Sequence, residues 1–120
     1  MTSESIEAAI KELVLVYGDG VRLAREGARS LVRLDAVQLY ETCRPPVTRM
    51  LLVFDPGQPK PQFYVVPDQL LTNGKAPKNQ ATTIVGGESW MGCSFNIPWK
   101  EGDTIIRFVA AARQRFSQPE

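Results

Sequence analysis

The sequence predicts an α+β domain in which helices lie on one face of an antiparallel sheet. Two observations predict it: apolar residues recur at helical spacing at both ends of the chain, and short β-patterned stretches separated by turn residues lie between them. With 120 residues, 43% apolar and 22% charged, the chain can bury one core but is too short for two domains. We therefore expect a single domain over residues 1–120.

The first predicted element is an amphipathic helix near the N-terminus. Ser3 can cap its free amides, and the stretch 18–20, Gly-Asp-Gly, ends it because glycine tolerates the left-handed conformation found at helix ends. Residues at helical spacing form its predicted apolar face: Ile6, Ile10, Leu13, Val14 and Tyr17.

A four-stranded antiparallel meander is predicted next. Its strands are expected at residues 21–26, 31–40, 47–54 and 63–66. The apolar alternation of the second strand shifts at Ala36-Val37, which predicts a β-bulge. The third strand is apolar on both faces over residues 50–54, as expected of a central strand that is covered by a helix.

An irregular loop and a second helix complete the predicted order of elements. Residues 67–98 are rich in glycine, proline and asparagine and show little sustained period, but this part of the chain also contains aromatic residues that disordered segments tend to lack. We expect an ordered, irregular loop here. Asp103 is the predicted N-cap of the last helix, whose apolar stripe is Ile105, Val109, Ala112 and Phe116.

The absence of histidine from all 120 residues narrows the chemistry that the chain can perform. It excludes Ser-His-Asp and Cys-His nucleophile pairs, histidine bases and every histidine-containing metal site. Two cysteines, Cys43 and Cys93, cannot form a four-thiolate zinc site, and no CxxC motif exists. We expect no metal and no cofactor.

Charge and hydropathy exclude further partners. A net charge of +1 provides no strong field for nucleic acid or for an anionic membrane. No apolar run approaches the roughly 18 residues that a membrane-spanning helix needs. The N-terminus lacks a basic region followed by an apolar one, so we expect no signal peptide, a cytoplasmic protein and free thiols.

Several conspicuous residues are better explained by structure than by function. Glycines at 18–20 and 86–87 lack the spacing of a phosphate-binding loop and are expected to be turns. Four arginines over residues 22–33 alternate with apolar and acidic residues, which favours a solvated sheet face. Trp90 and Trp99 are expected to anchor the core.

Cys93 remains the candidate reactive group, within the sequence Gly-Cys-Ser-Phe-Asn at residues 92–96. A lone cysteine is more often a small apolar filler of the core, because free cysteine is among the most buried residue types. The residues that follow favour a functional interpretation.

Residues 99–105, Trp-Lys-Glu-Gly-Asp-Thr-Ile, resemble the tryptophan, turn, Thr-Ile and helix that follow the active cysteine in ubiquitin-conjugating enzymes. The predicted order of elements is similar to the UBC fold of that family. The resemblance is closest to diverged prokaryotic ubiquitin-conjugating-enzyme-like proteins, in which a tryptophan, a Trp-Ser-Arg-His-like element, a second tryptophan and an acidic helix start match Trp90, residues 93–96, Trp99 and Asp103.

This resemblance implies a carrier that takes a ubiquitin-like modifier from an activating enzyme as a thioester or ester and passes it to an amine of a target protein. The prokaryotic relatives are encoded in bacterial conjugation operons, some of them linked to phage defence. The His-Pro-Asn element that precedes the cysteine in the eukaryotic enzymes is absent. The alternative is therefore a catalytically inactive UBC-fold adaptor that binds a ubiquitin-like protein or an activating enzyme.

The nucleophile of such a carrier is either Cys93 or Ser94. A cysteine thiol titrates near pH ~8.5, so some thiolate exists at neutral pH without a histidine base, whereas a hydroxyl needs one. The chemistry favours Cys93, and the resemblance favours Ser94. The side-chain amides of Asn79 and Asn96, or backbone N–H groups, are the candidates for stabilising a tetrahedral oxyanion, and Gly92 would let the backbone approach closely.

Overall fold

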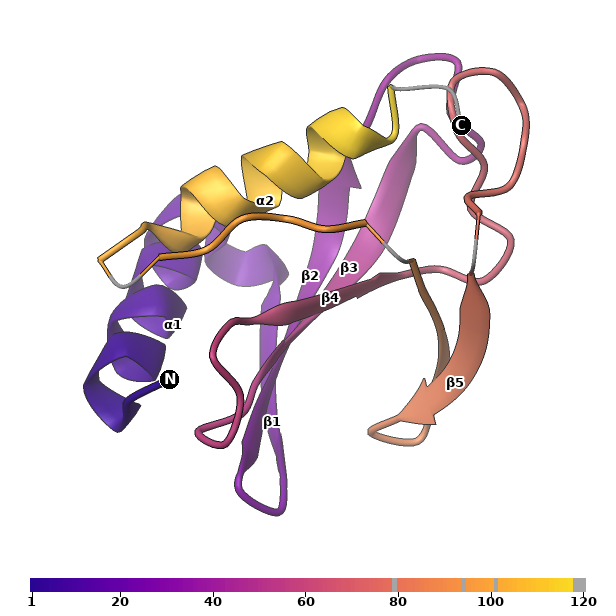
Figure 1. Ribbon diagram of the computed structural model, residues 1–120. Helices are drawn as coiled ribbons and strands as arrows, with labels where there is room; N and C mark the ends of the chain where they lie inside the picture. Colours follow the sequence, from indigo (N-terminus) through magenta and orange to yellow (C-terminus); the bar gives the residue numbers. More distant parts are fainter. Residues whose placement is uncertain (79, 94, 101, 118–120) are drawn as a thin grey trace.

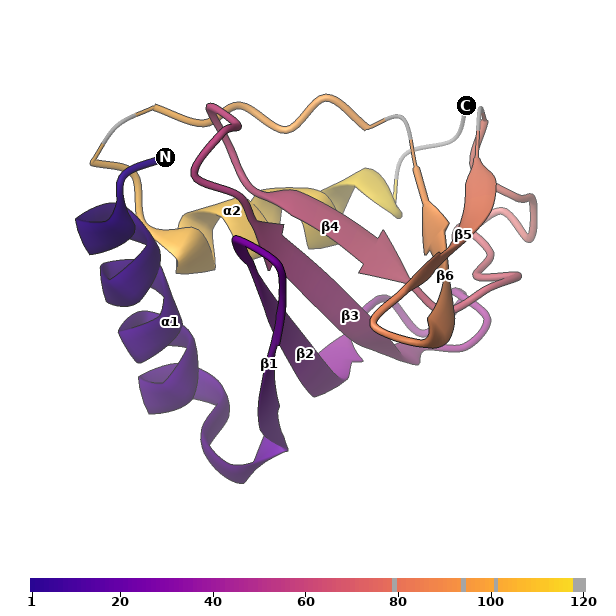
Figure 2. The ribbon, with the colours of Figure 1, turned by 90° about the horizontal axis from the view of Figure 1, so that it is seen from below.

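Two helices lie across one face of a curled six-stranded antiparallel sheet (Figure 1), and the last two strands fold over part of the other face (Figure 2). The computed structural model describes residues 1–78, 80–93, 95–100 and 102–117. The elements are, in chain order, α1 (Ser3–Tyr17), η1 (Gly18–Gly20), β1 (Val21–Glu26), β2 (Arg29–Gln38), β3 (Val47–Phe54), β4 (Gln62–Val65), β5 (Ala81–Val85), β6 (Glu88–Gly92) and α2 (Ile105–Arg115). The predicted α+β architecture is confirmed, with a helix near each end.

The sheet has six strands rather than the four that the sequence predicts. Its order is β1-β2-β3-β4-β6-β5, so the first four strands form the expected meander and β6 then pairs with β4. The two additional strands come from the stretch predicted to be irregular. Gly86 and Gly87 have φ values of 60° and 82°, which are the positive values of the tight two-residue turn that closes a hairpin.

The predicted bulge in β2 is confirmed, and it keeps the strand aligned with the core. The pairing of β2 with β3 shifts between Leu34 and Val37. Val32, Leu34 and Val37 are all fully buried in the core under the helices. Without the shift, strict alternation would turn Val37 toward the opposite face of the sheet.

The central strand β3 is buried on both faces, as predicted. Met50, Leu52 and Phe54 belong to the core cluster beneath the helices, whereas Leu51 and Val53 belong to a second cluster on the other face. Helix α1 supplies Ile6, Ala9 and Leu13, and the predicted stripe at the C-terminal end comes from α2 (Ile105, Val109, Ala112) and its C-cap residue Phe116. None of the helices in the described ranges is long and apolar enough to cross a membrane.

Helix α1 departs from the prediction at its cap and along one side. The cap is Thr2, whose hydroxyl accepts a hydrogen bond from the Ser5 backbone N–H at 3.1 Å, and not Ser3. Gly18 ends the helix with a positive φ of 58°, as expected. Val14 does not join the buried face and is 43% exposed, because the buried residues follow a narrower stripe than the predicted one.

Helix α2 begins one residue later than predicted and is tied to α1. Thr104 is its cap and accepts from the Arg107 backbone N–H at 3.3 Å, so the assignment of Asp103 as the cap is wrong. The first turn of α2 has a second backbone N–H group without a partner inside the helix, and a carboxylate of α1 binds it: Glu12 Oε1 accepts a hydrogen bond from the Ile106 N–H at 2.8 Å. Negative charge at a helix N-terminus is favourable, so this bond fixes how the two helices meet.

The face of the sheet opposite the helices is partly covered by the β5–β6 hairpin. Trp90, 2% exposed, and Val85 pack there against Leu31, Leu51 and Val53. The hairpin tip is bound to the β1–β2 hairpin by a 2.9 Å hydrogen bond from the Gly86 N–H to Glu26 Oε2. Trp90 is thus a core anchor, as expected.

Arginines of β1 and β2 form ion pairs on the sheet face that the sequence predicts to be solvated. Arg22 and Arg33 lie 3.6 and 3.2 Å from the Asp35 carboxylate, and Arg29 pairs with Glu26. Pairs as exposed as these contribute little each, and they leave the face solvated.

We expect the Trp90→Ala variant to lose about 3–5 kcal/mol of unfolding free energy, since it removes a large buried side chain from the second cluster. Urea denaturation followed by circular dichroism measures the change. Leu15→Ala is the control, because Leu15 is 85% exposed and its truncation should change stability by less than ~0.5 kcal/mol. Equal losses in both variants would contradict the packing of the hairpin on the sheet.

Candidate functional site

The candidate site lies where β6 leaves the sheet. β6 pairs with β4 at only two positions, Tyr64 with Gly92 and Val65 with Met91, so the beginning of β4 extends beyond the end of β6. An open cavity of about 210 Å³ occupies this place. Its lining consists of Lys60, Pro61, Gln62, Phe63, Tyr64, Gly92, Cys93, Phe95, Ile97 and Phe108.

The chain turns away from the sheet after Cys93 because the residues that follow are buried against α2. Phe95 and Ile97 are 8% and 2% exposed. The Phe95 ring stacks with Phe63 at 6.3 Å between ring centres and meets Phe116 edge-on at 5.2 Å. Residues 95–100 therefore run as an extended segment along α2 (Figure 1).

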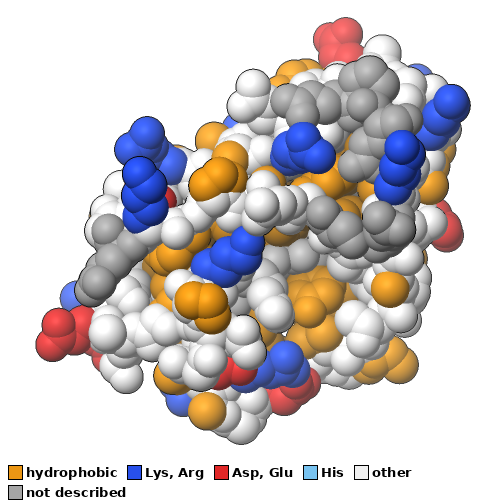
Figure 3. Space-filling model, in the orientation of Figure 1, with side chains coloured by type: hydrophobic (Ala, Val, Ile, Leu, Met, Phe, Trp, Pro, Cys, Tyr) orange, Lys and Arg blue, Asp and Glu red, His pale blue; other side chains and the backbone are white. Residues whose placement is uncertain are grey.

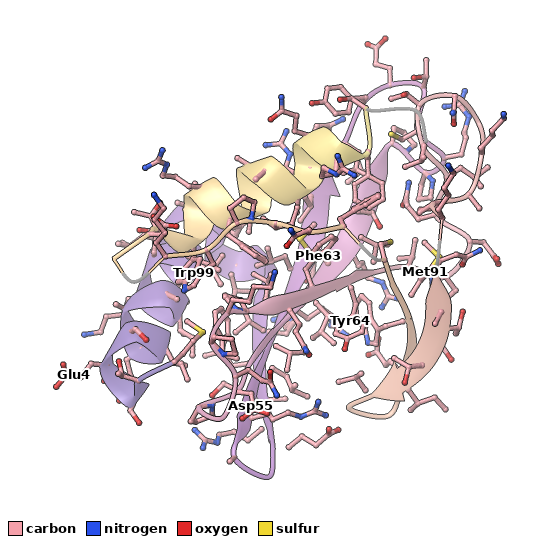
Figure 4. The ribbon with its side chains drawn as sticks, in the orientation of Figure 1. Glu4, Asp55, Phe63, Tyr64, Met91 and Trp99 are labelled. Atoms are coloured by element: carbon pink, nitrogen blue, oxygen red, sulfur yellow. The ribbon has the colours of Figure 1, made fainter. Side chains whose placement is uncertain are left out.

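Two aromatic side chains of β4 face opposite sides of the sheet (Figure 4). Phe63 points toward α2 and belongs to the helix-side core, whereas Tyr64 packs with the second cluster. A Cβ atom added at Gly92 would lie 3.2 Å from Tyr64 Cε1. The absence of a side chain at Gly92 thus leaves room for the Tyr64 ring, and the close approach of the Gly92 backbone to a reacting carbonyl group stays a prediction.

The two cysteines occupy different environments. Cys43 is fully buried, and its Sγ lies 3.8 Å from the Phe116 carbonyl oxygen. Cys93 is partly buried, packs at the margin of the helix-side core and lines the cavity. Neither cysteine forms a disulfide within the described residues. Of the two, Cys93 is therefore the thiol that a reactant in the cavity can meet.

Asn96 lies at the rim of this site and contacts a residue that the sequence analysis missed. Its side-chain Oδ1 accepts a 3.1 Å hydrogen bond from Lys60 Nζ, which also donates to the Ile97 carbonyl at 3.3 Å. With the oxygen engaged, the donor half of this amide is its Nδ2 group. In the sequence, Lys60 lies between two prolines, Pro59 and Pro61. Because proline restricts the backbone, these neighbours were the signal that Lys60 is held in a fixed conformation.

The structure brings Cys93, Asn96 and Lys60 together, but it does not test every predicted residue. Asn79 and Ser94 lie outside the described residues. Trp90 belongs to the sequence pattern that resembles ubiquitin-conjugating-enzyme-like proteins. It packs on the opposite face of the sheet from Phe63 and Phe95. Trp99 is partly buried and meets Phe108 edge-on at 5.9 Å.

Lys60 is the charged residue among the described residues that line the cavity. Apolar side chains lie between several basic ones on the face that carries residues 95–100 (Figure 3). Arg115 adds a guanidinium 5.1 Å from the Phe95 ring centre. Within the described ranges, no group of three metal-ligating side chains could hold a metal ion. The site is therefore suited to a developing negative charge.

A larger cavity of about 680 Å³ lies between the first turns of α1, Pro59 and the start of α2. Its described lining includes Trp99 and Glu12 but neither Cys93 nor Asn96. It is separate in its lining from the Cys93 cavity.

Comparison of the chain with models of protein families, with curated proteins and with solved structures finds no match.

We expect N-ethylmaleimide to alkylate Cys93 at least about tenfold faster than Cys43, because modification of a fully buried thiol requires an opening of the fold. Intact-mass spectrometry after timed quenching, with peptide mapping, measures both rates. Cys93→Ala is the control and should lose the fast adduct. If Cys43 reacts first, or if both thiols react slowly, Cys93 is a structural cysteine.

Proposed function

We propose that this chain is a ubiquitin-conjugating-enzyme-like carrier that holds the C-terminus of a ubiquitin-like modifier as a thioester on Cys93. The observation that carries the proposal is a partly buried thiol at an open cavity, with the Lys60 ammonium in the same lining. The order of helix, antiparallel sheet, extended segment and helix supports a UBC-like interpretation of the fold, although the sheet has two more strands than that interpretation expected.

The loading step is an exchange of thioesters. The Cys93 thiolate attacks the carbonyl carbon of the modifier's C-terminal glycine while this carbon is bound to the thiol of an activating enzyme. A new carbon–sulfur bond forms, the old one breaks, and the leaving thiolate takes a proton from water. No oxidant, metal or histidine is required, which suits a chain without histidine.

The tetrahedral intermediate places negative charge on the former carbonyl oxygen. Lys60 supplies a cationic donor in the cavity lining, and the Asn96 Nδ2 group is the amide donor at its rim. Donors that are already held in place stabilise such an oxyanion without reorganisation, and one donor typically contributes 10²–10³-fold in rate. Here the Lys60–Asn96 bond holds both groups.

The discharge step transfers the acyl group to an amine of the target. The neutral amine attacks the thioester carbon, a carbon–nitrogen bond forms, and Cys93 leaves as thiolate. The proton released by the amine passes to solvent or to a group of the target, because the lining contributes no carboxylate in the described part of the chain. The same lack of a base is what an inactive adaptor would have, so the adaptor is the second candidate.

A synthetic peptide ending in Gly-Gly, supplied as the thioester of a small thiol, tests the carrier function. We expect Cys93 to accept the peptide at least about tenfold faster than glutathione does at the same pH, since the cavity positions the reacting groups. Intact mass measures the adduct, which dithiothreitol should remove. Ser94→Ala should keep the adduct and Cys93→Ala should lose it.

Other outcomes of this experiment are equally specific. An adduct that survives Cys93→Ala, resists dithiothreitol and disappears in Ser94→Ala would make Ser94 the nucleophile. Reversible binding of the corresponding peptide amide, with no acylation and no change in a Cys93→Ala/Ser94→Ala double variant, would assign the adaptor function instead.

Lys60→Met should slow this acylation by about 10-fold or more, because it removes the cation that faces the oxyanion. Lys60→Arg should keep most of the rate. Lys75→Met is the matched control, since Lys75 is exposed and outside the cavity lining, and it should react like the unmodified chain. The measurement is the pseudo-first-order rate of adduct formation. A normal rate in Lys60→Met would remove Lys60 from the mechanism.

A further inference from the structure

The two edge strands of the sheet are protected to different degrees. β1 forms one edge and carries Arg22, Arg25 and Glu26 among its six residues. β5 forms the other edge, and its sequence Ala-Thr-Thr-Ile-Val contains no charge and no proline. Charged residues and prolines on an edge discourage pairing with another chain, so β1 has such protection and β5 lacks it.

The residues of β5 are suited to pairing and are open to solvent. Four of them are β-branched, and its first four residues are exposed. Ile84 is 72% exposed, the largest value for an apolar side chain in the sheet. Within the described residues, no strand pairs with the outer edge of β5. An exposed, uncharged edge of this kind offers a row of backbone donors and acceptors to another strand.

The β5–β6 hairpin is held firmly, so this edge has a fixed position. Val85 is buried in the second cluster, and the Gly86 N–H is bound to Glu26 at 2.9 Å. At the start of β6, Glu88 accepts from Arg33 at 2.8 Å and from Arg49 at 3.2 Å. A preformed edge costs little ordering entropy when a second strand pairs with it.

We propose that β5 is a dimerisation edge, at which two copies of the chain pair antiparallel about a two-fold axis through Thr83. The full-length register places Ala81 of one copy opposite Val85 of the other and Thr82 opposite Ile84, while the two Thr83 residues face each other. The two six-stranded sheets then form one continuous twelve-stranded sheet.

A second copy is the occupant because the edge is complementary to itself. Every pair in this register joins a smaller side chain to a β-branched one or joins two threonines, and the central Thr83 pair is of a kind that stabilises neighbouring strands. No pair brings charges together. A two-fold axis also makes the contact self-limiting, because each copy uses its free β5 edge once, while the charges on β1 disfavour growth at the other edge.

The contact is small, so the dimer should depend on concentration. A five-residue strand pair buries less than the roughly 1,000 Å² expected of a stable interface, which is typical of weak and transient complexes, so protein concentrations of about 1–100 μM are a suitable range for a test. Sedimentation equilibrium across roughly this range tests the proposal. We expect the weight-average mass to rise from 13.3 kDa toward twice that value.

Two charge variants test the register. In the Thr82→Lys/Ile84→Lys variant, like charges lie opposite each other on both sides of the central Thr83 pair. This variant should remain monomeric. Mixing it with Thr82→Glu/Ile84→Glu should restore the dimer, which can occur only if the two β5 strands meet. Both sites are exposed, so circular dichroism and the melting temperature should be unchanged. Leu23→Lys on β1 is the matched control, because Leu23 is 59% exposed at the other edge, and it should dimerise normally.

Each other result would overturn the proposal. A chain that is monomeric throughout would do so, as would a dimer that persists in Thr82→Lys/Ile84→Lys, that is lost in Leu23→Lys or that is not restored by the mixture. A monomeric chain that binds a synthetic peptide of residues 80–86 would instead assign the edge to an extended segment of another protein.

Discussion

The burial of Phe95 is the constraint on which the candidate site depends. Its ring packs against Phe63 and Phe116, so the chain must leave the sheet directly after β6. If β6 continued alongside β4, its backbone would fill the space that is now the cavity. A single apolar anchor thus ends the strand, leaves the cavity open and sets Cys93 in its wall. The Lys60 bonds to Asn96 and Ile97 then hold the anchored segment over that wall.

Trp90 has the corresponding role on the other face of the sheet. The ion pairs of Glu88 with Arg33 and Arg49 involve side chains that are 30–45% exposed, and pairs of this kind contribute at most about 1 kcal/mol each. Burial of the tryptophan contributes several times as much. Apolar contact therefore holds the hairpin against the sheet, while the ion pairs and the bond from Gly86 to Glu26 set its orientation.

The sequence was sufficient to predict those elements in which burial produces a regular spacing of apolar residues. The stripe of α2 and the bulge of β2 were readable because one face of each element excludes water, and the unbroken apolar run of β3 was readable because both of its faces do. β5 was missed because four of its residues are exposed, which removes the alternation, although the glycine pair at 86–87 was a hairpin signal. Of the candidate site, Cys93 and Asn96 were named in advance. Lys60 was not, because its role depends on a contact 36 residues away along the chain.

The Cys93 cavity and the outer edge of β5 lie on opposite sides of β6, so acylation and strand pairing take place at separate sites. The cavity opens between β6 and β4, whereas the outer edge of β5 is one strand farther on the other side. Only Ala81, at the start of β5, pairs with the cavity residue Gly92; strands are spaced about 4.8 Å apart, so β5 lies roughly 10 Å from β4, which forms the other wall of the cavity. That distance exceeds the screening length of about 8 Å at physiological ionic strength. Acylation at Cys93 and pairing at β5 can therefore be altered one at a time, and neither proposal depends on the other.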